Sequence, residues 1–157
     1  MKNNKIKPKS KTFKQVVEET EEIKNGYQNG LKALSKYSNK VELGDTKKCE
    51  GSVAIDDCTE ILYPQGNRWD YVFSYKGEAY FVEVHSAHTS EVSVVLKKLQ
   101  WLKDWLNSKA PEIKKLQAKD KAFIWIQTNG NHILPKSSQN RLLAEKGLKP
   151  VSKLILD

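Results

Sequence analysis

Cysteine and arginine are scarce in this chain. Cys49 and Cys58 are the only cysteines, so a four-cysteine zinc site is excluded, and we interpret both as reduced thiols. Arg68 and Arg141 are the only arginines, which argues against extensive reading of base edges by bidentate arginine contacts. A glycine-rich loop of the phosphate-binding type is also missing, which disfavours a nucleotide-binding enzyme of that class.

Long apolar runs are absent as well. No stretch approaches the ~18 consecutive apolar residues of a membrane-spanning helix, and no apolar segment follows the basic N-terminus as in a secretory signal. We therefore expect a cytoplasmic protein with no membrane partner. A length of 157 residues suits one domain with its own core. We expect that domain over residues 13–157, preceded by a flexible basic arm over residues 1–12.

Positive charge is concentrated in that arm. The formal net charge is +8, and the first 14 residues hold six lysines and no acid, so the remaining chain has a net charge of only +2. A short lysine arm suits loose contact with phosphates. The alternative is a solvated tail without a partner. The candidate nucleic-acid contacts are Lys5, Lys7, Lys9, Lys11 and Arg68.

Hydrophobic periodicity predicts an α/β fold. Apolar residues at helical spacing favour a first helix with a break near Gly26 or Gly30, and a later helix with a stripe from Val92 to Leu106. A hairpin with its turn at Lys76-Gly77 lies between them. We expect helices at 13–38, 90–107 and 139–147, and strands at 51–56, 60–64, 68–75, 78–85, 121–128 and 151–156. The segment from 79 to 128 should form a parallel crossover in a mixed sheet flanked by helices.

Two tryptophans fall off the apolar stripe of the second helix. Trp101 and Trp105 must be covered either by another segment, such as the first helix or residues 108–118, or by a partner such as a second copy of the chain. We favour cover by another segment.

The hairpin brings two carboxylates together. With a two-residue turn, Asp70 lies opposite Glu83 and Arg68 lies opposite His85, and all four side chains share one face. Like charges directly opposite each other destabilise a sheet unless a cation lies between them or one carboxyl is protonated. A hard divalent cation fits this need, and the alternative is neutralisation by Arg68.

This arrangement resembles the PD-(D/E)XK nuclease superfamily, which includes restriction endonucleases. Asp70, twelve intervening residues, Glu83-Val84-His85, a helix and an apolar strand follow the order of its motif. The resemblance covers about residues 13–128. It implies a restriction endonuclease-like core of the order αβββαβ, here with an added C-terminal helix and strand. It also implies that Asp70 and Glu83 bind Mg²⁺ or Mn²⁺.

The chain departs from this family pattern at one important position. His85 stands where the family has a lysine, which orients the attacking water and offsets developing phosphate charge. Some members carry a relocated lysine on the following helix, so Lys98 or Lys97 is a candidate catalytic residue beside Asp70, Glu83 and His85. Glu19 is a candidate for the glutamate that many members use from the first helix.

Four functions therefore compete. The first is a metal-dependent DNA nuclease, with His85 as base or water-orienting group. The second is a nuclease-fold protein that binds nucleic acid without cutting it, and the third is an interaction module or homodimer using Trp101 and Trp105. The fourth is a zinc hydrolase of small molecules built on Glu83, His85 and His88, whose spacing matches no recognisable zinc-hydrolase motif.

Overall fold

A mixed five-stranded sheet organises the chain. The computed structural model describes residues 10–157, and its main sheet has the strand order β1-β3-β4-β5-β7. Three antiparallel pairings join the first four strands, and β5 and β7 are parallel. The strands are β1 (Gln28–Asn29), β3 (Gly51–Ala54), β4 (Tyr71–Tyr75), β5 (Glu78–Val84) and β7 (Phe123–Ile126). The expected mixed sheet flanked by helices is confirmed.

The register of the β4–β5 hairpin is the one that the sequence predicts. Tyr75 pairs with Glu78 and Tyr71 pairs with Val82, with Lys76 and Gly77 forming the turn. Both turn residues have positive φ, 51° for Lys76 and 78° for Gly77, as hairpin turns of two residues require. The pairing stops one residue short of Asp70, so the two carboxylates lie at the end of this ladder.

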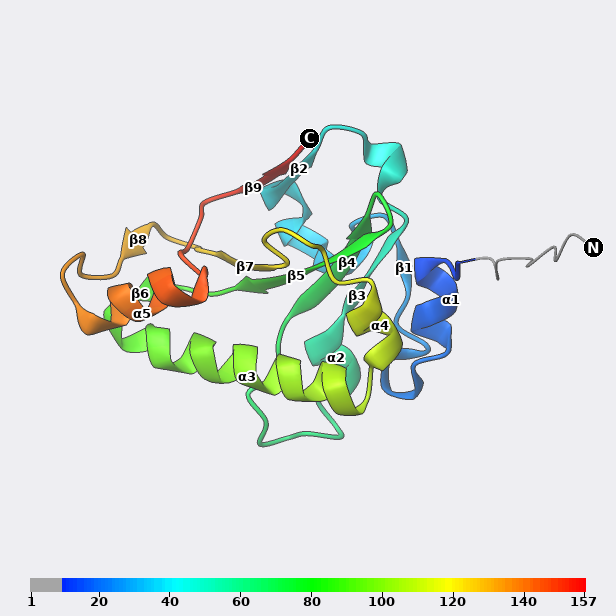
Figure 1. Cartoon of the computed structure of the whole chain (residues 1–157), viewed down its shortest axis with the longest axis horizontal. Helices are drawn as coiled ribbons and strands as arrows, with labels where there is room; N and C mark the ends of the chain where they lie inside the picture. The colour runs from blue at the N-terminus through cyan, green and yellow to red at the C-terminus, as the bar shows by residue number, and fades with distance from the viewer. Residues whose placement is uncertain (1–9) are drawn as a thin grey trace, which may run out of the picture.

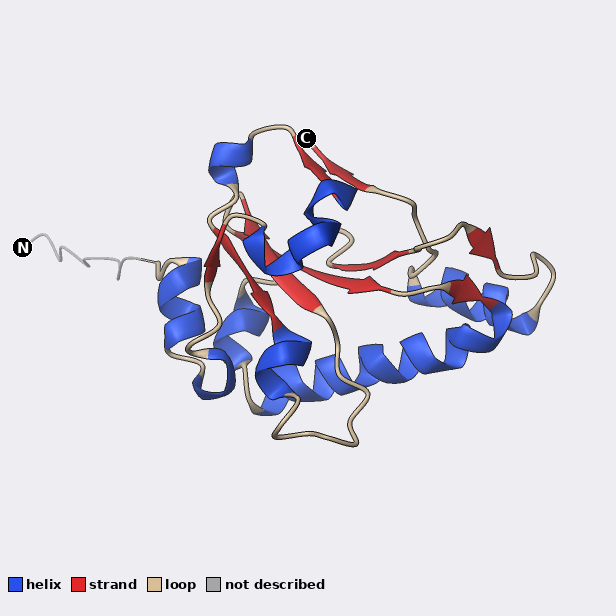
Figure 2. Cartoon of the chain, turned by 180° about the vertical axis from the view of Figure 1, so that it is seen from behind, coloured by secondary structure: helices blue, strands red, loops and turns tan. Residues whose placement is uncertain are grey.

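Both faces of the sheet are covered (Figures 1 and 2). One face packs against α1 (Phe13–Glu18), α2 (Ile55–Thr59), the long α3 (Val92–Ser108) and α4 (Pro111–Lys115), and its core includes Val72, Phe81, Val95 and Leu102. The other face packs against the 3-10 helix η2 (Lys32–Lys40) and a small parallel pair, β2 (Val41–Leu43) with β9 (Leu154–Leu156). Alternating side chains of β4, β5 and β7 therefore enter two separate cores.

The N-terminal helix is much shorter than the predicted 13–38. After α1 the chain forms the 3-10 helix η1 (Glu21–Ile23), strand β1 and then η2. The Thr20 hydroxyl donates to the Val16 carbonyl at 2.7 Å, and Gly26 packs so tightly that an added Cβ would meet the Cys58 Sγ at 2.4 Å. A continuous helix would carry Gly26 away from this contact, so close packing overrides the apolar periodicity.

Two other strand predictions are wrong. Residues 60–64 form a turn after α2, with Ile61 and Leu62 exposed at 92% and 56%. Residues 68–70 precede β4 rather than belonging to it, so strict alternation fails there and Trp69 enters the core beneath α3. Apolar content alone does not make a strand where no neighbouring strand accepts its backbone hydrogen bonds.

The C-terminal third follows the prediction more closely. β7 is buried on both faces, as its continuous apolar run indicates, and helix α5 (Ser138–Lys146) ends at Gly147 in the left-handed conformation, with φ of 63°. Strand β9 pairs with β2, and Val151 alone forms a bridge to Ile126 of the main sheet. The short strands β6 (Ala87–His88) and β8 (Asn131–His132) form a further parallel pair.

The helices of residues 10–157 include none that is long and apolar enough to span a membrane.

Two fully buried tryptophans allow a matched stability prediction. Trp125 donates from Nε1 to the His85 carbonyl at 2.8 Å, whereas Trp69 Nε1 is buried with no hydrogen-bond partner among the described residues. Trp125→Phe is expected to lower the free energy of unfolding by about 2 kcal/mol or more, because it removes the indole donor from the partly buried His85 carbonyl. Trp69→Phe removes a polar group that is already unpaired, so its loss should stay near 1 kcal/mol. Urea denaturation checks both, and a larger loss for Trp69→Phe would contradict this account.

Candidate functional site

Asp70 and Glu83 interlock at the end of the β4–β5 hairpin. The Asp70 backbone N–H donates to Glu83 Oε1 at 3.2 Å, and the Val84 N–H donates to Asp70 Oδ2 at 3.0 Å. Each carboxylate is thus held by the backbone of the opposite segment. Glu83 is completely buried, and Asp70 is mostly buried. The predicted juxtaposition of the two acids is confirmed.

Lys98 supplies a positive charge to this pair. Its Nζ lies 2.7 Å from Glu83 Oε2 and comes from the second turn of α3. Burial lowers the pKa of Lys98, but the Glu83 carboxylate and its hydrogen bond outweigh burial, so the pKa is raised. Of the two candidate lysines, Lys98 therefore reaches the carboxylates, whereas Lys97 is exposed on α3.

His85 bridges two acidic side chains. Its Nδ1 lies 3.3 Å from Glu83 Oε2, and its Nε2 lies 3.0 Å from Glu91 Oε2. The hydrogen bond to Glu83 raises the pKa of His85, burial opposes this effect, and Glu91 adds to it. Both ring nitrogens are therefore engaged, which favours a charged imidazolium. This geometry suits a second fixed cation better than a free proton acceptor.

The site is short of positive charge. Burial and the nearby Glu83 charge raise the pKa of Asp70 from 3.8 to about 7, and Lys98 only partly offsets this. Near neutral pH Asp70 is therefore poised between its protonated and ionised forms. A group in this state takes up either a proton or another cation.

Arg68 does not face His85 and does not neutralise the carboxylate pair. Its Nε lies 2.6 Å from Asp56 Oδ1, and one of its terminal nitrogens donates to the Tyr63 carbonyl at 2.6 Å. The reason is that residue 68 lies outside β4, so the predicted alternation does not extend to it. Arg68 instead anchors the loop before β4, and Lys98 takes the neutralising role considered for Arg68.

The other sequence candidates lie away from this centre. Glu19 pairs with Lys11 at 2.7 Å in an exposed ion pair, and His88 stacks on His132 with ring centroids 5.1 Å apart. Lys5, Lys7 and Lys9 lie outside the described residues. Across residues 10–157, no three His, Cys, Asp or Glu side chains are grouped so as to hold a metal ion.

Sequence reasoning did not assign two acidic residues that shape the site. Glu91 binds His85, and Asp56 binds Arg68. Glu91 stands six residues after His85, at the start of a helix. This spacing is the available signal, because a turn between the strand and the helix can bring Glu91 back toward His85. Asp56 lies in the first turn of α2, and its N–H donates to the Asp70 carbonyl at 3.3 Å, but no spacing rule connects it to Arg68.

Comparisons with known proteins give no relative: no family model, no curated protein and no solved structure matches this chain. Any functional assignment therefore depends on the residues and their geometry.

Proposed function

We propose that this chain is a metal-dependent nuclease of the PD-(D/E)XK type, which hydrolyses phosphodiester bonds in DNA. The observation that carries the proposal is the meeting of Asp70, Glu83 and Lys98, with Lys98 Nζ 2.7 Å from Glu83. An aspartate, a second acid and a lysine are the three groups of that motif, here with the lysine supplied by the following helix. The order α1, β3, β4, β5, α3, β7, with α2 inserted between β3 and β4, also supports the proposal, because the family core runs helix, three-stranded meander, helix and strand.

The donor set suits Mg²⁺ or Mn²⁺, because both ions prefer carboxylate oxygens and retain bound water. Asp70 and Glu83 would hold the ion. Asp70 Oδ2 accepts the Val84 N–H, and no described residue donates to Oδ1, which leaves an oxygen for a ligand. The raised pKa of Asp70 fits a site that gains from one more positive charge. In such a site the bound ion supplies Lewis acidity and an activated water.

The remaining groups have roles set by their charge. Lys98 holds an ammonium beside the carboxylates, where it stabilises negative charge that develops on a phosphate. His85, held between Glu83 and Glu91, adds a second cation on the strand where the family has its lysine. Arg68 is committed to Asp56, so lysines of the N-terminal arm remain the candidates for backbone phosphates. Binding through such lysines weakens steeply as salt rises.

Cleavage of supercoiled plasmid with Mg²⁺ or Mn²⁺ tests the proposal. Asp70→Ala and Glu83→Ala are each expected to slow nicking by at least about 100-fold, because each removes a ligand and a preorganised charge. Glu78→Gln is the matched control, since Glu78 lies at the opposite end of β5, where it accepts the Lys119 N–H. It should cut like the wild type. Equal nicking by all four proteins would exclude these residues as the catalytic centre.

A second candidate is a nuclease-fold protein that binds nucleic acid without cutting it. One observation favours it: Glu83 is fully buried, and both of its oxygens already accept hydrogen bonds from the protein. A metal would then compete with the Lys98 ammonium for Glu83. Salt-sensitive DNA binding by the wild type, with no nicking under either metal, would select this candidate over the nuclease.

A further inference from the structure

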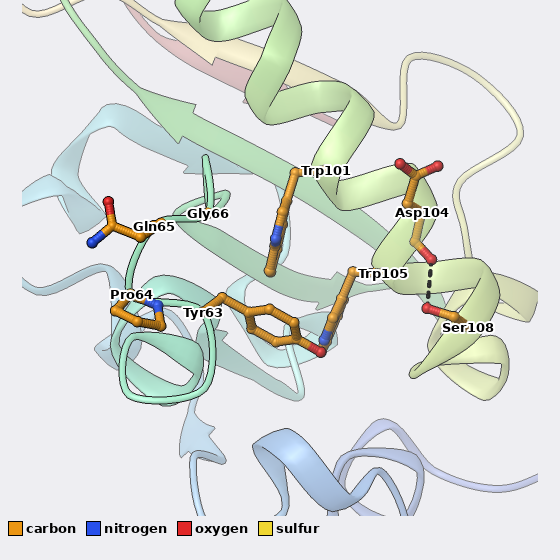
Figure 3. Close-up of a pocket in the computed structure, with 8 residues that line it drawn as sticks. All are labelled: Tyr63, Pro64, Gln65, Gly66, Trp101, Asp104, Trp105 and Ser108. Carbon is orange, nitrogen blue, oxygen red and sulfur yellow. Dashed lines mark hydrogen bonds between the residues drawn. The ribbon is translucent and has the colours of Figure 1, made fainter.

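A pocket of about 480 Å³ lies beside α3, away from the carboxylates (Figure 3). One wall is the C-terminal half of α3, and the other is the loop that follows α2. The lining includes Tyr63, Gly66, Trp101, Asp104, Trp105 and Ser108. Four of these residues recur along one face of α3, so the pocket is a groove between that face and the loop. Its volume is in the range of small-ligand sites.

Three aromatic rings form the apolar surface of this pocket. Trp101 and Trp105 are nearly parallel, with centroids 5.9 Å apart and planes 9° apart, and Tyr63 meets Trp101 edge to face at 5.5 Å and 83°. Trp105 is 3% exposed, and Trp101 and Tyr63 keep part of their surface open. The loop approaches closely, because a Cβ on Gly66 would lie 3.1 Å from Trp101 Nε1.

Glu22 fixes the orientation of two of the rings. Its carboxylate accepts the Trp105 Nε1–H at 2.7 Å and the Tyr63 hydroxyl at 2.8 Å. These bonds also place a negative charge behind the aromatic wall. Burial and Glu22 raise the pKa of Tyr63 to about 12, so its hydroxyl stays protonated and keeps donating. Tyr63 and Trp105 are therefore held in fixed orientations, and Trp101 packs against both of them.

The charge around the pocket is negative. Asp104 is exposed at the rim, Glu22 lies behind the rings, and no lining residue is basic. Arg68, which contacts the Tyr63 and Gly66 carbonyls from behind the loop, is paired with Asp56. Aromatic faces attract cations through their ring quadrupoles, most strongly at Trp, and nearby carboxylates add to this attraction. The same carboxylates repel the phosphate of a nucleotide.

We propose that this aromatic pocket binds an alkylated ammonium group, with Trp101 and Tyr63 as the contact faces and Asp104 as the counter-charge. The group belongs either to a free quaternary ammonium compound or to a methylated lysine of another protein, and both share the same chemistry. None of Asp70, Glu83 or Lys98 lines the pocket, so this proposal stands or falls separately from nuclease activity.

Isothermal titration of the whole chain with choline, and with its neutral carbon isostere 3,3-dimethylbutan-1-ol, tests the proposal. Choline is expected to bind at least about 5-fold more tightly than the alcohol, because only the cation interacts with the ring quadrupoles. Trp101→Leu should weaken choline binding about 10-fold or more, since Trp is the strongest of the three faces. Peptides carrying trimethyllysine or unmodified lysine, titrated in parallel, distinguish a protein source from a free compound.

Asp104→Asn should weaken choline binding by about 2- to 3-fold, and Asp120→Asn, which changes an exposed carboxyl outside the pocket, should leave it unchanged. Three results would overturn the proposal. The first is that choline does not bind at about 20 mM, a concentration at which a site with a dissociation constant of about 1 mM would be nearly saturated. The second is that choline and the alcohol bind equally well. The third is that deoxyadenosine monophosphate binds more tightly than choline. The last result would identify the pocket as a stacking site for a nucleobase.

Discussion

Lys98→Met is expected to lower the free energy of unfolding at neutral pH by about 3 to 5 kcal/mol. Glu83 is completely buried, and Lys98 Nζ at 2.7 Å is the closest cation to it. Removing one partner of a buried ion pair leaves the other charge short of compensation in a medium of low polarity, and here only His85, 3.3 Å from Glu83, would remain as a cationic neighbour. For a chain of this length the loss corresponds to a fall in the melting temperature of roughly 6 to 20 °C. Thermal and urea denaturation measure it.

Two variants separate the charge effect from a general effect on α3. Lys97→Met changes the exposed neighbour of Lys98, so its free energy of unfolding should stay within about 0.5 kcal/mol of the wild type. The double variant Lys98→Met with Glu83→Gln should recover most of the stability, because a neutral amide at position 83 needs no counter-ion. If Lys98→Met is no less stable than Lys97→Met, the contact between Lys98 and Glu83 does not contribute to the stability of the fold.

The hairpin was predictable because its information is local. Aromatic and β-branched runs on both sides of Lys76-Gly77 fix the turn, the turn fixes the register, and the register places Asp70 near Glu83. The apolar stripe of α3 and the continuous apolar run of β7 are equally local patterns. Sequence reasoning thus reached the centre of the candidate site without any contact information.

The failures all involve contacts between segments distant in sequence. The continuation of the first helix fails where Gly26 packs against Cys58, and the partner of Arg68 is Asp56 rather than a residue across the hairpin. Trp105 donates to Glu22 of η1, which lies within the 13–38 segment that the sequence suggested as its cover. Tyr63, which donates to the same carboxylate, comes from a loop that the sequence did not suggest. That another segment of the chain covers Trp105 is correct, but periodicity does not carry the identity of the covering loop.

The sequence alone also left open whether Lys97 or Lys98 reaches the carboxylates. Both lie within the span of the apolar stripe of α3, but on different sides of the helix, so the rotation of α3 about its own axis decides which one reaches Glu83. That rotation is set by which side of α3 is buried, and Val95 and Leu102 enter the same core as Val72 and Phe81.

Asp70→Asn is expected to stabilise the metal-free protein at about pH 8, and to do so less at about pH 5. The folded-state pKa of Asp70 is about 7, above its ordinary value of 3.8, because of burial and the Glu83 charge. The folded state therefore binds this proton more tightly than the unfolded state. The resulting stability is present below about pH 4 and is lost as the pH rises through about 7. Asparagine stays neutral, so it keeps that stability at every pH.

The size of the effect follows from the shift. One pKa unit corresponds to about 1.36 kcal/mol, so the stability difference between Asp70→Asn and the wild type should grow by roughly 2 to 3 kcal/mol from about pH 5 to about pH 8. Asparagine can still accept the Val84 N–H that Asp70 Oδ2 accepts, so the local fold is retained. Asp104→Asn, at an exposed carboxyl, should change the free energy of unfolding by no more than about 0.5 kcal/mol at either pH. Denaturant titrations at both pH values give the comparison.

Adding Mg²⁺ or Mn²⁺ connects this stability difference to the proposed function. A cation that binds only the folded wild type stabilises it by mass action, so the advantage of Asp70→Asn at about pH 8 should shrink as metal is added. The variant itself should not respond, because it lacks one of the two charged ligands. If added metal leaves the pH-dependent difference unchanged, the raised pKa of Asp70 is not linked to cation binding. That result would favour the non-cleaving candidate. A wild-type chain that is stabilised by metal at about pH 8, and much less at about pH 5, would show that proton and metal compete for the same carboxylate.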